Sequence, residues 1–560
     1  MKPIQLLIIL GSFLIIACTS SKQIAQKPHI ITSAFAKKQA LTQKEKQNWY
    51  FKDIFEDSIL GVSLEKAYKK LLKNKKSDTI IVALIDTELD IDHEDLKDQI
   101  WTNKDEIPNN NIDDDNNGYI DDIQGWNYAN TKIGDAIPNS SYSYTRIIKK
   151  YDSLFKRMPL SSIPSNQKKW FHEYLRALKR YDKEKKTRQK NIDKYNRINR
   201  NFIKADSVLA NYFPRKNYTI AQLDSLKATT MDSILISEIS NMKSFLKGRV
   251  SKKRTDRYLN REFNVLNTLL NLSYNDRQIQ GDNIHDILDI DYGNNNIQGT
   301  KKIHHGTQVM SILAASRKNN IGIDGISNLI RIMPVSISVS GDEFDKDIAL
   351  AIRYAVDNGA KIINMSIGKE FSMHPNWLKE AIQYAESKDV LIVSSAGNKS
   401  YDLSKEFDYP DDYDENGEFA KNFIKVGASS YKADSTMVWL SSNYSQKNVD
   451  IFAPGHKIYC QTRKRSSYYS GTSYASPIVA GIAALIRSHY PNLSAIEVKE
   501  IILASGISFD VDVVQPYPYG EKQPSEKIPF SSLSKSGKIV NAYNALLMAE
   551  EVSKKKKRKK

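Results

Sequence analysis

The sequence predicts an α/β fold in which a parallel sheet is covered by helices on both faces and is interrupted by a long α-helical insertion. Continuous apolar runs of strand length alternate along the chain with segments of helical period. Residues 131–280, between the first and second of these runs, have a different and strongly basic composition. With 560 residues, of which 40% are hydrophobic and 26% charged, the chain can bury a sizeable core.

The chain begins with a segment that predicts export. One lysine precedes an apolar run at residues 6–17, which is shorter than the roughly 20 residues of a membrane-spanning helix. We therefore interpret residues 1–17 as a signal peptide. The end of this segment, Ala17-Cys18, resembles the lipobox of bacterial lipoproteins, in which the cysteine carries a lipid such as palmitate. The alternative is a short signal peptide whose cysteine is incidental.

Lipidation of Cys18 would make residues 18–44 a tether. A lipidated Cys18 predicts a protein of the cell envelope that is lipid-anchored to a bacterial membrane, at the outer membrane or facing the periplasm. The sequence does not determine which membrane leaflet carries it. The second cysteine, Cys460, lies in an apolar stretch typical of a strand, so we expect a buried, inert thiol.

The first strand is predicted at residues 79–85, a continuous apolar run of the kind buried on both faces of a sheet. The later predicted strands are residues 330–339, 360–367, 390–394 and 423–428, and helix-like segments at 344–358 and 375–387 lie between them. We expect a first part of the body at 45–130 and a second at 281–550. Because the strands are parallel, polar groups at their carboxyl ends should meet at one edge.

The charge of the chain is concentrated outside this body. The formal net charge is +17, yet residues 131–280 contain 32 Lys and Arg against 13 Asp and Glu. Residues 551–560 form a basic tail, in which seven consecutive Lys or Arg begin at Lys554. We expect this tail to be solvated and disordered, with contact to anionic lipid or polysaccharide as the alternative.

Residues 131–280 predict a basic helical insertion. Segments 167–201 and 219–249 have helical periodicity and predict a hairpin or small bundle. The first segment carries a stripe at helical spacing, made of Trp170, Tyr174, Leu178 and Tyr181. Such a stripe indicates a helix-packing seam rather than a nucleic-acid platform. No zinc-finger, nucleotide-binding or RNA-binding motif accompanies it. We expect no specific nucleic-acid partner. An anionic envelope polymer could bind the basic helices and tail; lid, substrate guide, partner dock or passive decoration remain open roles for the insertion.

Four polar residues fall at predicted strand ends or helix starts and carry the chemistry of acyl transfer: Asp86, His305, Asn398 and Ser473. A serine hydroxyl becomes a nucleophile when an imidazole accepts its proton, and a carboxylate fixes the tautomer of that imidazole. An asparagine amide and a backbone N–H at a helix start can stabilise an oxyanion. Taken singly, each residue has a structural explanation as a loop, turn or capping residue; the combination favours catalysis.

The surrounding motifs resemble those of the subtilisin-like serine peptidases. The matching segments are the strand-ending Asp86, the His-Gly-Thr at 305–307, the Ser-Ala-Gly-Asn at 395–398 and the Gly-Thr-Ser-Tyr-Ala-Ser-Pro at 471–477. The chain order Asp, His, Ser is also that of subtilisin. The segment Ser366-Ile367-Gly368 resembles the family's edge segment, whose backbone binds an extended substrate as an added strand.

This resemblance implies a subtilisin-like sheet and a serine endopeptidase that acts on proteins or peptides through an acyl-enzyme and needs no cofactor for catalysis. With the signal segment and the lipobox-like Cys18, we predict an exported, lipid-anchored form of this enzyme. His305 would be the general base, Ser473 the nucleophile, Asp86 the orienting carboxylate and Asn398 an oxyanion donor. The alternative is a catalytically inactive envelope protein that uses the cleft and the basic helices for binding.

Two features of the sequence bear on this interpretation. Glu88 stands two residues after Asp86, where the family usually has glycine; it would either raise the pKa of His305 or point to solvent. The short stretch between Cys18 and the start of the body leaves little room for a folding-assisting prodomain. Substrate specificity, the physiological target and the oligomeric state are not determined by the sequence.

An acidic loop before the insertion predicts a structural calcium site. Its residues match positions 1, 3, 5, 7 and 9 of a calcium-binding loop: Asp113, Asp115, Asn117, Tyr119 and Asp121. Position 12 is Gln124 rather than glutamate, and no helix clearly precedes the loop. An Asp/Asn-rich turn without metal is therefore the alternative.

Overall fold

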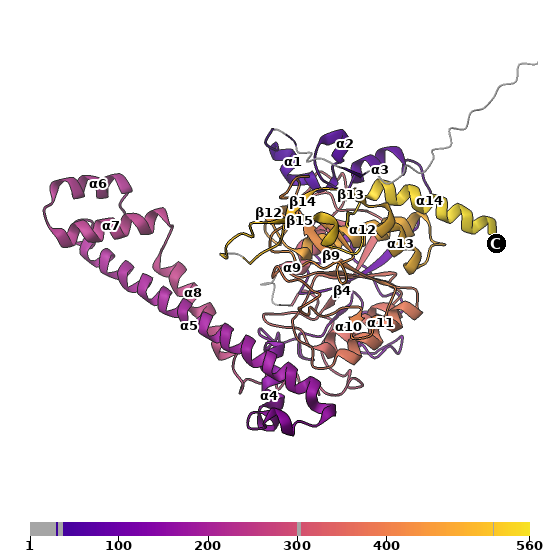
Figure 1. Cartoon of the computed structure of the whole chain (residues 1–560), viewed down its shortest axis with the longest axis horizontal. Coiled ribbons are helices and arrows are strands. Elements are labelled where there is room, and N and C mark those ends of the chain that lie inside the picture. Colours follow the sequence, from indigo (N-terminus) through magenta and orange to yellow (C-terminus); the bar gives the residue numbers. More distant parts are fainter. Residues whose placement is uncertain (1–29, 32–36, 38, 300–303, 519, 560) are drawn as a thin grey trace, which may run out of the picture.

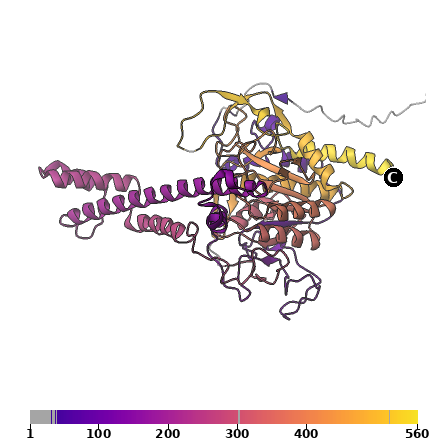
Figure 2. The same cartoon turned by 60° about the horizontal axis from the view of Figure 1, so that its bottom comes forward.

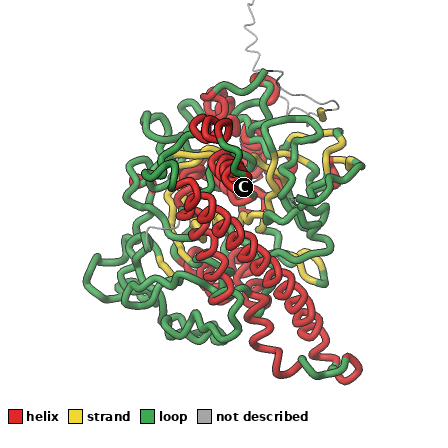
Figure 3. Tube along the Cα trace, turned by 90° about the vertical axis from the view of Figure 1, so that its left-hand side faces the viewer, coloured by secondary structure: helices red, strands yellow, loops and turns green. Residues whose placement is uncertain are grey.

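The computed structural model describes the chain except residues 1–29, 32–36, 38, 300–303, 519 and 560. The signal segment, Cys18 and most of the predicted tether lie outside the described residues. No helix within the described part combines the length and apolar character needed to cross a bilayer. Loops form much of the surface between the regular elements (Figure 3).

A ten-stranded sheet forms the centre of the body, in the order β1-β13-β16-β10-β9-β6-β5-β2-β4-β3. Its neighbouring strands are parallel except for the pair β13 and β16. The parallel-sheet prediction is therefore confirmed. The strands are β1 (Ile30–Ile31), β2 (Ile80–Asp86), β3 (Trp126–Asn127), β4 (Ile330–Ser336), β5 (Ile362–Met365), β6 (Leu391–Ser395), β9 (Phe423–Ser429), β10 (Ile451–Pro454), β13 (Ile507–Phe509) and β16 (Lys538–Ile539).

Helices cover both faces of this sheet, and the alternation of side chains along β2 shows the two layers. Val82 and Leu84 belong to a core cluster shared with α9 (His305–Ala314) and α12 (Thr472–His489). Ala83 and Ile85 point to the other cluster, which contains residues of α10 (Asp345–Asp357) and α11 (Pro375–Ser387). Because both faces of β2 are buried, its sequence is a continuous apolar run without polar alternation. The first face also packs against α3 (Leu64–Lys70), α13 (Ala495–Ser505) and α14 (Ala542–Lys559).

Small elements surround this three-layer body. Three antiparallel hairpins are formed by β7 (Tyr413–Asp414) with β8 (Gly417–Glu418), β11 (Ile458–Gln461) with β12 (Ser466–Tyr469), and β14 (Asp512–Val514) with β15 (Lys527–Pro529). Two short helices, α1 (Gln43–Asn48) and α2 (Ile54–Asp57), precede α3. Cys460 lies in β11 and is buried, and burial raises the pKa of its thiol, as expected for an inert cysteine.

The basic insertion forms an arm that extends from the body (Figures 1 and 2). Its helices are α4 (Ser143–Phe155), α5 (Lys168–Ala210), α6 (Ile220–Thr229), α7 (Ser233–Lys247) and α8 (Lys252–Asn267). The aromatic stripe of α5 packs at the root of the arm with residues of α4 and α8 and with Phe371 of the body. A second apolar cluster joins the end of α5 to α6 and α7 at the tip. The predicted helix packing is therefore confirmed.

The segment with helical periodicity at 219–249 forms two helices. Thr219 caps α6 by accepting a hydrogen bond from the Gln222 amide. Asp232 caps α7 by accepting hydrogen bonds from the Ile234 and Leu235 amides. A second set of capping groups in the middle of the segment starts a new helix and lets α7 turn back along the end of α5.

The expectation of a disordered tail is wrong for residues up to Lys559, which continue α14. The first half of this helix buries Ala545, Leu546 and Ala549 in the core. In its basic half, Lys554 pairs with Glu550 one turn earlier in the same helix, and Lys556 pairs with Glu497 of α13. A helix already anchored by apolar packing can propagate through lysines at little cost, because lysine is a good helix former.

Candidate active site

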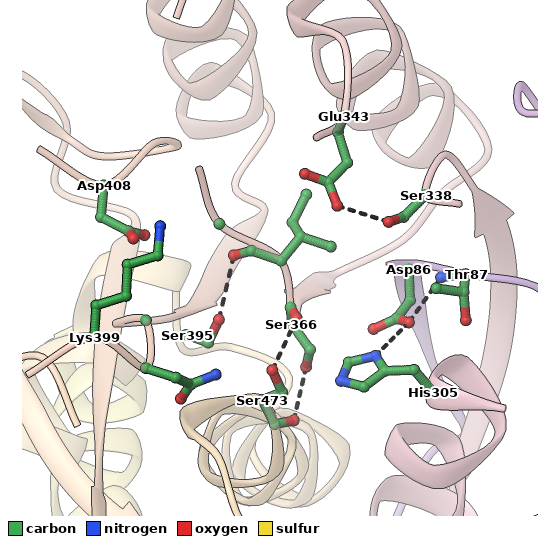
Figure 4. A pocket seen from close by; sticks show the side chains of 14 residues that line it. Asp86, Thr87, His305, Ser338, Glu343, Ser366, Ser395, Lys399, Asp408 and Ser473 are labelled. Atoms are coloured by element: carbon green, nitrogen blue, oxygen red, sulfur yellow. Dashed lines mark hydrogen bonds and ion pairs between the residues drawn. The ribbon is translucent and has the colours of Figure 1, made fainter. Parts of the chain in front are cut away.

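The carboxyl edge of the sheet brings the predicted catalytic side chains together. Asp86 is the last residue of β2, and Asn398 lies in the turn that follows β6. His305 is the first residue of α9 and Ser473 the second of α12. All four line one cleft of about 320 Å³, together with the predicted substrate-binding residues Ser366, Ile367 and Gly368 (Figure 4).

Asp86 and His305 form a close pair. The imidazole Nδ1 lies 2.7 Å from the Asp86 Oδ1, and the backbone N–H of Thr87 donates to the same oxygen at 2.7 Å. Asp86 is fully buried. Burial alone would lower the pKa of His305, but the Asp86 carboxylate stabilises the imidazolium and raises that pKa above its ordinary value. The pair can thus hold a proton on the imidazole during a reaction.

Ser473 lies on the other side of the imidazole (Figure 4). Its hydroxyl donates to the Ser366 carbonyl at 3.1 Å, and no hydrogen bond between Ser473 and His305 is formed within the described residues. Rotation about the Cα–Cβ bond is sufficient to redirect a serine hydroxyl, and such bonds are often formed only when substrate is bound. Ser366 also fixes the backbone here, since its own hydroxyl donates to the Ser473 carbonyl at 2.9 Å.

The Asn398 side chain is oriented by the start of α12. Its Oδ1 accepts hydrogen bonds from the Thr472 backbone N–H at 2.8 Å and from the Thr472 hydroxyl at 2.9 Å. With the oxygen held in this way, the Nδ2 hydrogens are the groups that can donate to a ligand in the cleft. The backbone N–H of Ser473 lies in the first turn of the same helix and offers a second donor.

The chain matches the family model described as the Subtilase family over residues 77–520. The chain belongs to the subtilase family. It is 37% identical over 221 residues to the thermophilic serine proteinase of Bacillus sp. (strain AK1), covering 39% of this chain and 49% of that protein. It is 34% identical over 199 residues to subtilisin DY of Bacillus licheniformis, covering 35% of this chain and 67% of that protein. The alignment with the first relative thus spans about half of that relative's length.

Five further residues line the cleft of this subtilase, and sequence reasoning missed them: Thr87, Ser338, Glu343, Lys399 and Asp408. Glu343 is buried; its Oε1 accepts a hydrogen bond from the Ser338 hydroxyl at 2.7 Å, and its charge contributes to the raised pKa of His305. Glu343 just precedes α10, so a polar residue at the start of a predicted helix was the available signal. Asp408 lies in a loop far from any predicted strand, where no signal pointed to the cleft.

The expectations for Glu88 need correction. Its side chain is buried, so it does not point to solvent. It fills the space beside Gly299, where an added Cβ would lie 2.4 Å from the Glu88 carboxyl carbon. Burial lowers the pKa of the neighbouring His304, and the charge of Glu88 opposes this only in part, whereas the carboxylates that raise the pKa of His305 are Asp86 and Glu343. The residue found in place of the family's glycine therefore acts on packing and on His304.

The acidic loop is arranged differently from the predicted calcium loop. Carboxylate oxygens of Asp113 and Asp115 lie within 4.8 Å of each other and of a carboxylate oxygen of Glu106, which precedes the loop. Asp121 does not belong to this group, because its carboxylate accepts hydrogen bonds from the amides of Asn110 and Asn111. Asn117 donates to Asp115 through Nδ2, and the Tyr119 ring packs in the core with Trp126.

Proposed function

We propose that this chain is a serine endopeptidase and that Asp86, His305 and Ser473 form its catalytic triad. The observation that supports this most directly is the 2.7 Å contact between a buried carboxylate and an imidazole that faces a serine at a helix start, in a cleft open to substrate. This is the arrangement that acyl transfer requires, and the chain order of the three residues agrees with it.

In the proposed reaction, the Ser473 hydroxyl leaves the Ser366 carbonyl and donates to the Nε2 of His305. As Oγ attacks the peptide carbonyl, the proton passes to Nε2, while the proton on Nδ1 stays hydrogen-bonded to Asp86. The carbonyl oxygen becomes negative and accepts hydrogen bonds from the Asn398 Nδ2 and the Ser473 N–H. Nε2 then protonates the leaving amine, and water hydrolyses the acyl-enzyme by the reverse sequence.

A fluorophosphonate probe separates this proposal from the alternative, an inactive envelope protein that only binds in the cleft. Such a probe phosphonylates a serine only when a base activates it. We expect labelling of the folded protein, none after heat denaturation, and none in Ser473→Ala. Ser470→Ala is the matched control, since Ser470 is three residues away and does not line the cleft. A well-folded protein that is not labelled would support the binding protein.

Replacement of Asn398 tests the oxyanion site. We expect Asn398→Ala to lower kcat for a peptide substrate by about 10²- to 10³-fold with a small change in KM, because the lost donor acts on charge that develops only in the transition state. Steady-state kinetics with a fluorogenic peptide measures both constants. A proportional rise in KM at unchanged kcat would instead place Asn398 in ordinary substrate binding.

The proposal extends to location. An apolar segment of signal-peptide length followed by a lipobox-like Cys18 supports export and lipid anchoring in a bacterial envelope. In cells given an alkyne fatty acid, we expect the wild-type protein to incorporate the lipid and to sediment with membranes. Cys18→Ala should lose the label and move to the soluble fraction, whereas Cys460→Ala should not. A membrane-bound, labelled Cys18→Ala protein would contradict the anchor.

The basic arm supports an anionic envelope polymer as a partner. Its net positive charge includes the start of α8, where Lys252, Lys253 and Arg257 line a shallow surface hollow. Retention on an immobilised anionic polysaccharide should fall with rising salt and should be lost when residues 190–255 are deleted. Equal retention of the wild-type and the deleted protein would show that the arm does not bind the polymer.

We also propose a structural calcium ion held by Glu106, Asp113 and Asp115, since a hard cation takes carboxylate oxygens. Burial raises the pKa of Glu106, and the charge of Asp115 adds to this effect, as expected for carboxylates that need a counter-ion. We expect a chelator to lower the melting temperature of the wild-type protein but not that of Asp115→Asn. Asp98→Asn, an exposed control, should respond like the wild type. Equal melting with and without chelator would exclude a stabilising ion.

A further inference from the structure

Asp408 lines the cleft with a carboxylate that the described residues do not fully satisfy. Its side chain is only 4% exposed, and its Oδ1 is buried without a hydrogen-bond partner among the described residues. Nevertheless it lines the same cleft as Ser473 and Asn398 (Figure 4). A buried carboxylate oxygen without a partner is costly, and such groups in native proteins are commonly completed by a ligand.

The cations nearest to Asp408 are engaged elsewhere. The Lys399 ammonium forms an ion pair with Glu370, and Glu370 is also held by Arg180 of the arm at 3.1 Å. The Lys425 ammonium donates to the backbone carbonyl of Asp408 at 2.6 Å and pairs with Asp411 at 3.5 Å. Within the described residues, no lysine or arginine nitrogen lies within 4.0 Å of the Asp408 carboxylate itself.

Two glycines give the cleft access to this carboxylate. A Cβ added to Gly368 would lie 2.6 Å from the Asp408 Oδ1, and one added to Gly397 would lie 2.7 Å from the Oδ2. Gly368 belongs to the segment predicted to pair with substrate, and Gly397 directly precedes Asn398. The carboxylate therefore lies between the two backbone segments that border the oxyanion donors, where the absence of side chains leaves space.

The position of the reacting carbonyl decides which part of a substrate reaches this space. That carbonyl must lie between the Ser473 Oγ and the Asn398 amide. The side chain of the residue that contributes the carbonyl, called P1, is attached one bond away and so enters the adjoining space between Gly368 and Gly397. Short polar side chains end before the base of the space, whereas lysine and arginine carry their charge at the end of a long apolar stem.

From this geometry we propose that Asp408 is a specificity-determining residue that selects substrates with arginine or lysine at P1. A cationic P1 side chain supplies both the charge and the hydrogen-bond donors that Oδ1 lacks, and an uncharged one leaves the carboxylate desolvated and unpaired. The inference rests on the proposed peptidase function and adds the substrate class of the same site.

The pH dependence of the preference follows from the same group. Burial raises the pKa of Asp408 to about 7. Besides Lys399 and Lys425, the charges that act on it are Asp411 and Glu370, which favour its protonated form. As the pH falls below 7, the carboxyl becomes neutral and loses its advantage for a cation. The ratio of rates for a charged and an uncharged P1 residue should therefore decrease, while effects of His305 cancel in the ratio.

The test compares two quenched peptides that differ only at P1, one with arginine and one with its neutral isostere citrulline. We expect wild-type kcat/KM at pH 8 to favour arginine by about 10²- to 10³-fold, since the other half of a buried charge pair is lost with citrulline. In Asp408→Asn the ratio should fall to within about tenfold and become independent of pH. Asp414→Asn, which changes a carboxylate six residues away that pairs with Lys379 and does not line the cleft, should keep the wild-type ratio.

Folding and catalysis are controlled separately. Asp408→Asn should melt at or above the wild-type temperature at pH 8. A carboxyl group whose pKa is higher in the folded than in the unfolded protein destabilises the fold once the pH exceeds its pKa in the unfolded chain. Binding of arginine- and citrulline-ended product peptides to Ser473→Ala, measured by calorimetry, requires no chemistry. If the arginine peptide binds more tightly than the citrulline peptide and Asp408→Asn abolishes this difference, the result supports Asp408 as the specificity-determining residue even if no peptide is cleaved. A ratio near one in both assays, or one unchanged by Asp408→Asn, overturns the proposal.

Discussion

Ser473→Ala is expected to reduce kcat/KM for a peptide substrate by about 10⁴- to 10⁶-fold. The hydroxyl at this position is the nucleophile that forms the acyl-enzyme, and without it the oxyanion donors and substrate contacts support only residual, direct attack by water. The methyl group of alanine fits the space, so the fold should be retained. The near-neutral change at Ser470→Ala, outside the cleft, provides the matched control for kinetics and melting.

Active-site titration strengthens this measurement. Wild-type enzyme should show a burst of product equal to the enzyme concentration with an activated ester, and Ser473→Ala should show none. A Ser473→Ala protein that is correctly folded and retains more than about a tenth of the wild-type rate would contradict the assignment of the nucleophile, because no loss of an essential nucleophile is that small.

Asp86→Asn is expected to lower kcat by about 10⁴-fold at neutral pH. The Asp86 Oδ1 accepts hydrogen bonds from both the Thr87 N–H and the His305 Nδ1, so it specifies the tautomer that leaves Nε2 free to accept a proton. An asparagine amide can donate to Nδ1 instead, which stabilises the other tautomer. Asp92→Asn, an exposed change six residues later, should have little effect.

The same variant has a pH signature. Asp86 raises the pKa of His305, so its loss should lower that pKa and move the acid limb of the kcat/KM profile to lower pH. The direction follows because the neutral imidazole is the active base. An imidazolium that no carboxylate stabilises has a lower pKa and therefore loses its proton at a lower pH. A variant with the wild-type rate, or an acid limb that moves to higher pH, would be incompatible with Asp86 as the orienting carboxylate.

The central sheet and the edge of the site could be predicted from the sequence for clear physical reasons. Strand β2 is buried on both faces, so its sequence is a continuous apolar run that ends at the first polar residue, Asp86. Ser473 and His305 are recognisable since each starts a helix that is itself almost entirely buried. The proximity of these residues in space depends on the order of the strands in the sheet. That order was inferred from the resemblance of the motifs to those of subtilisin-like peptidases.

The remaining parts of the site are determined by tertiary packing. Asp408 enters the cleft from an irregular loop, and its position depends on backbone contacts such as that with Lys425, which no local pattern encodes. Glu106 joins the acidic cluster from outside the calcium-loop motif. The helical tail failed as a prediction because seven like charges repel each other locally, whereas Glu497, from another helix, compensates one of them.

The placement of the arm within the chain also has a consequence for the folding of the enzyme. Strands β2 and β4 are direct neighbours, but the whole arm lies between them in the sequence, and Asp86 and His305 are 219 residues apart. Pairing over such a separation is slow to nucleate, although the apolar cluster at the tip lets the arm fold locally and shortens the loop to be closed. We therefore expect the contact between Asp86 and His305, which depends on closing this long loop, to form late in folding.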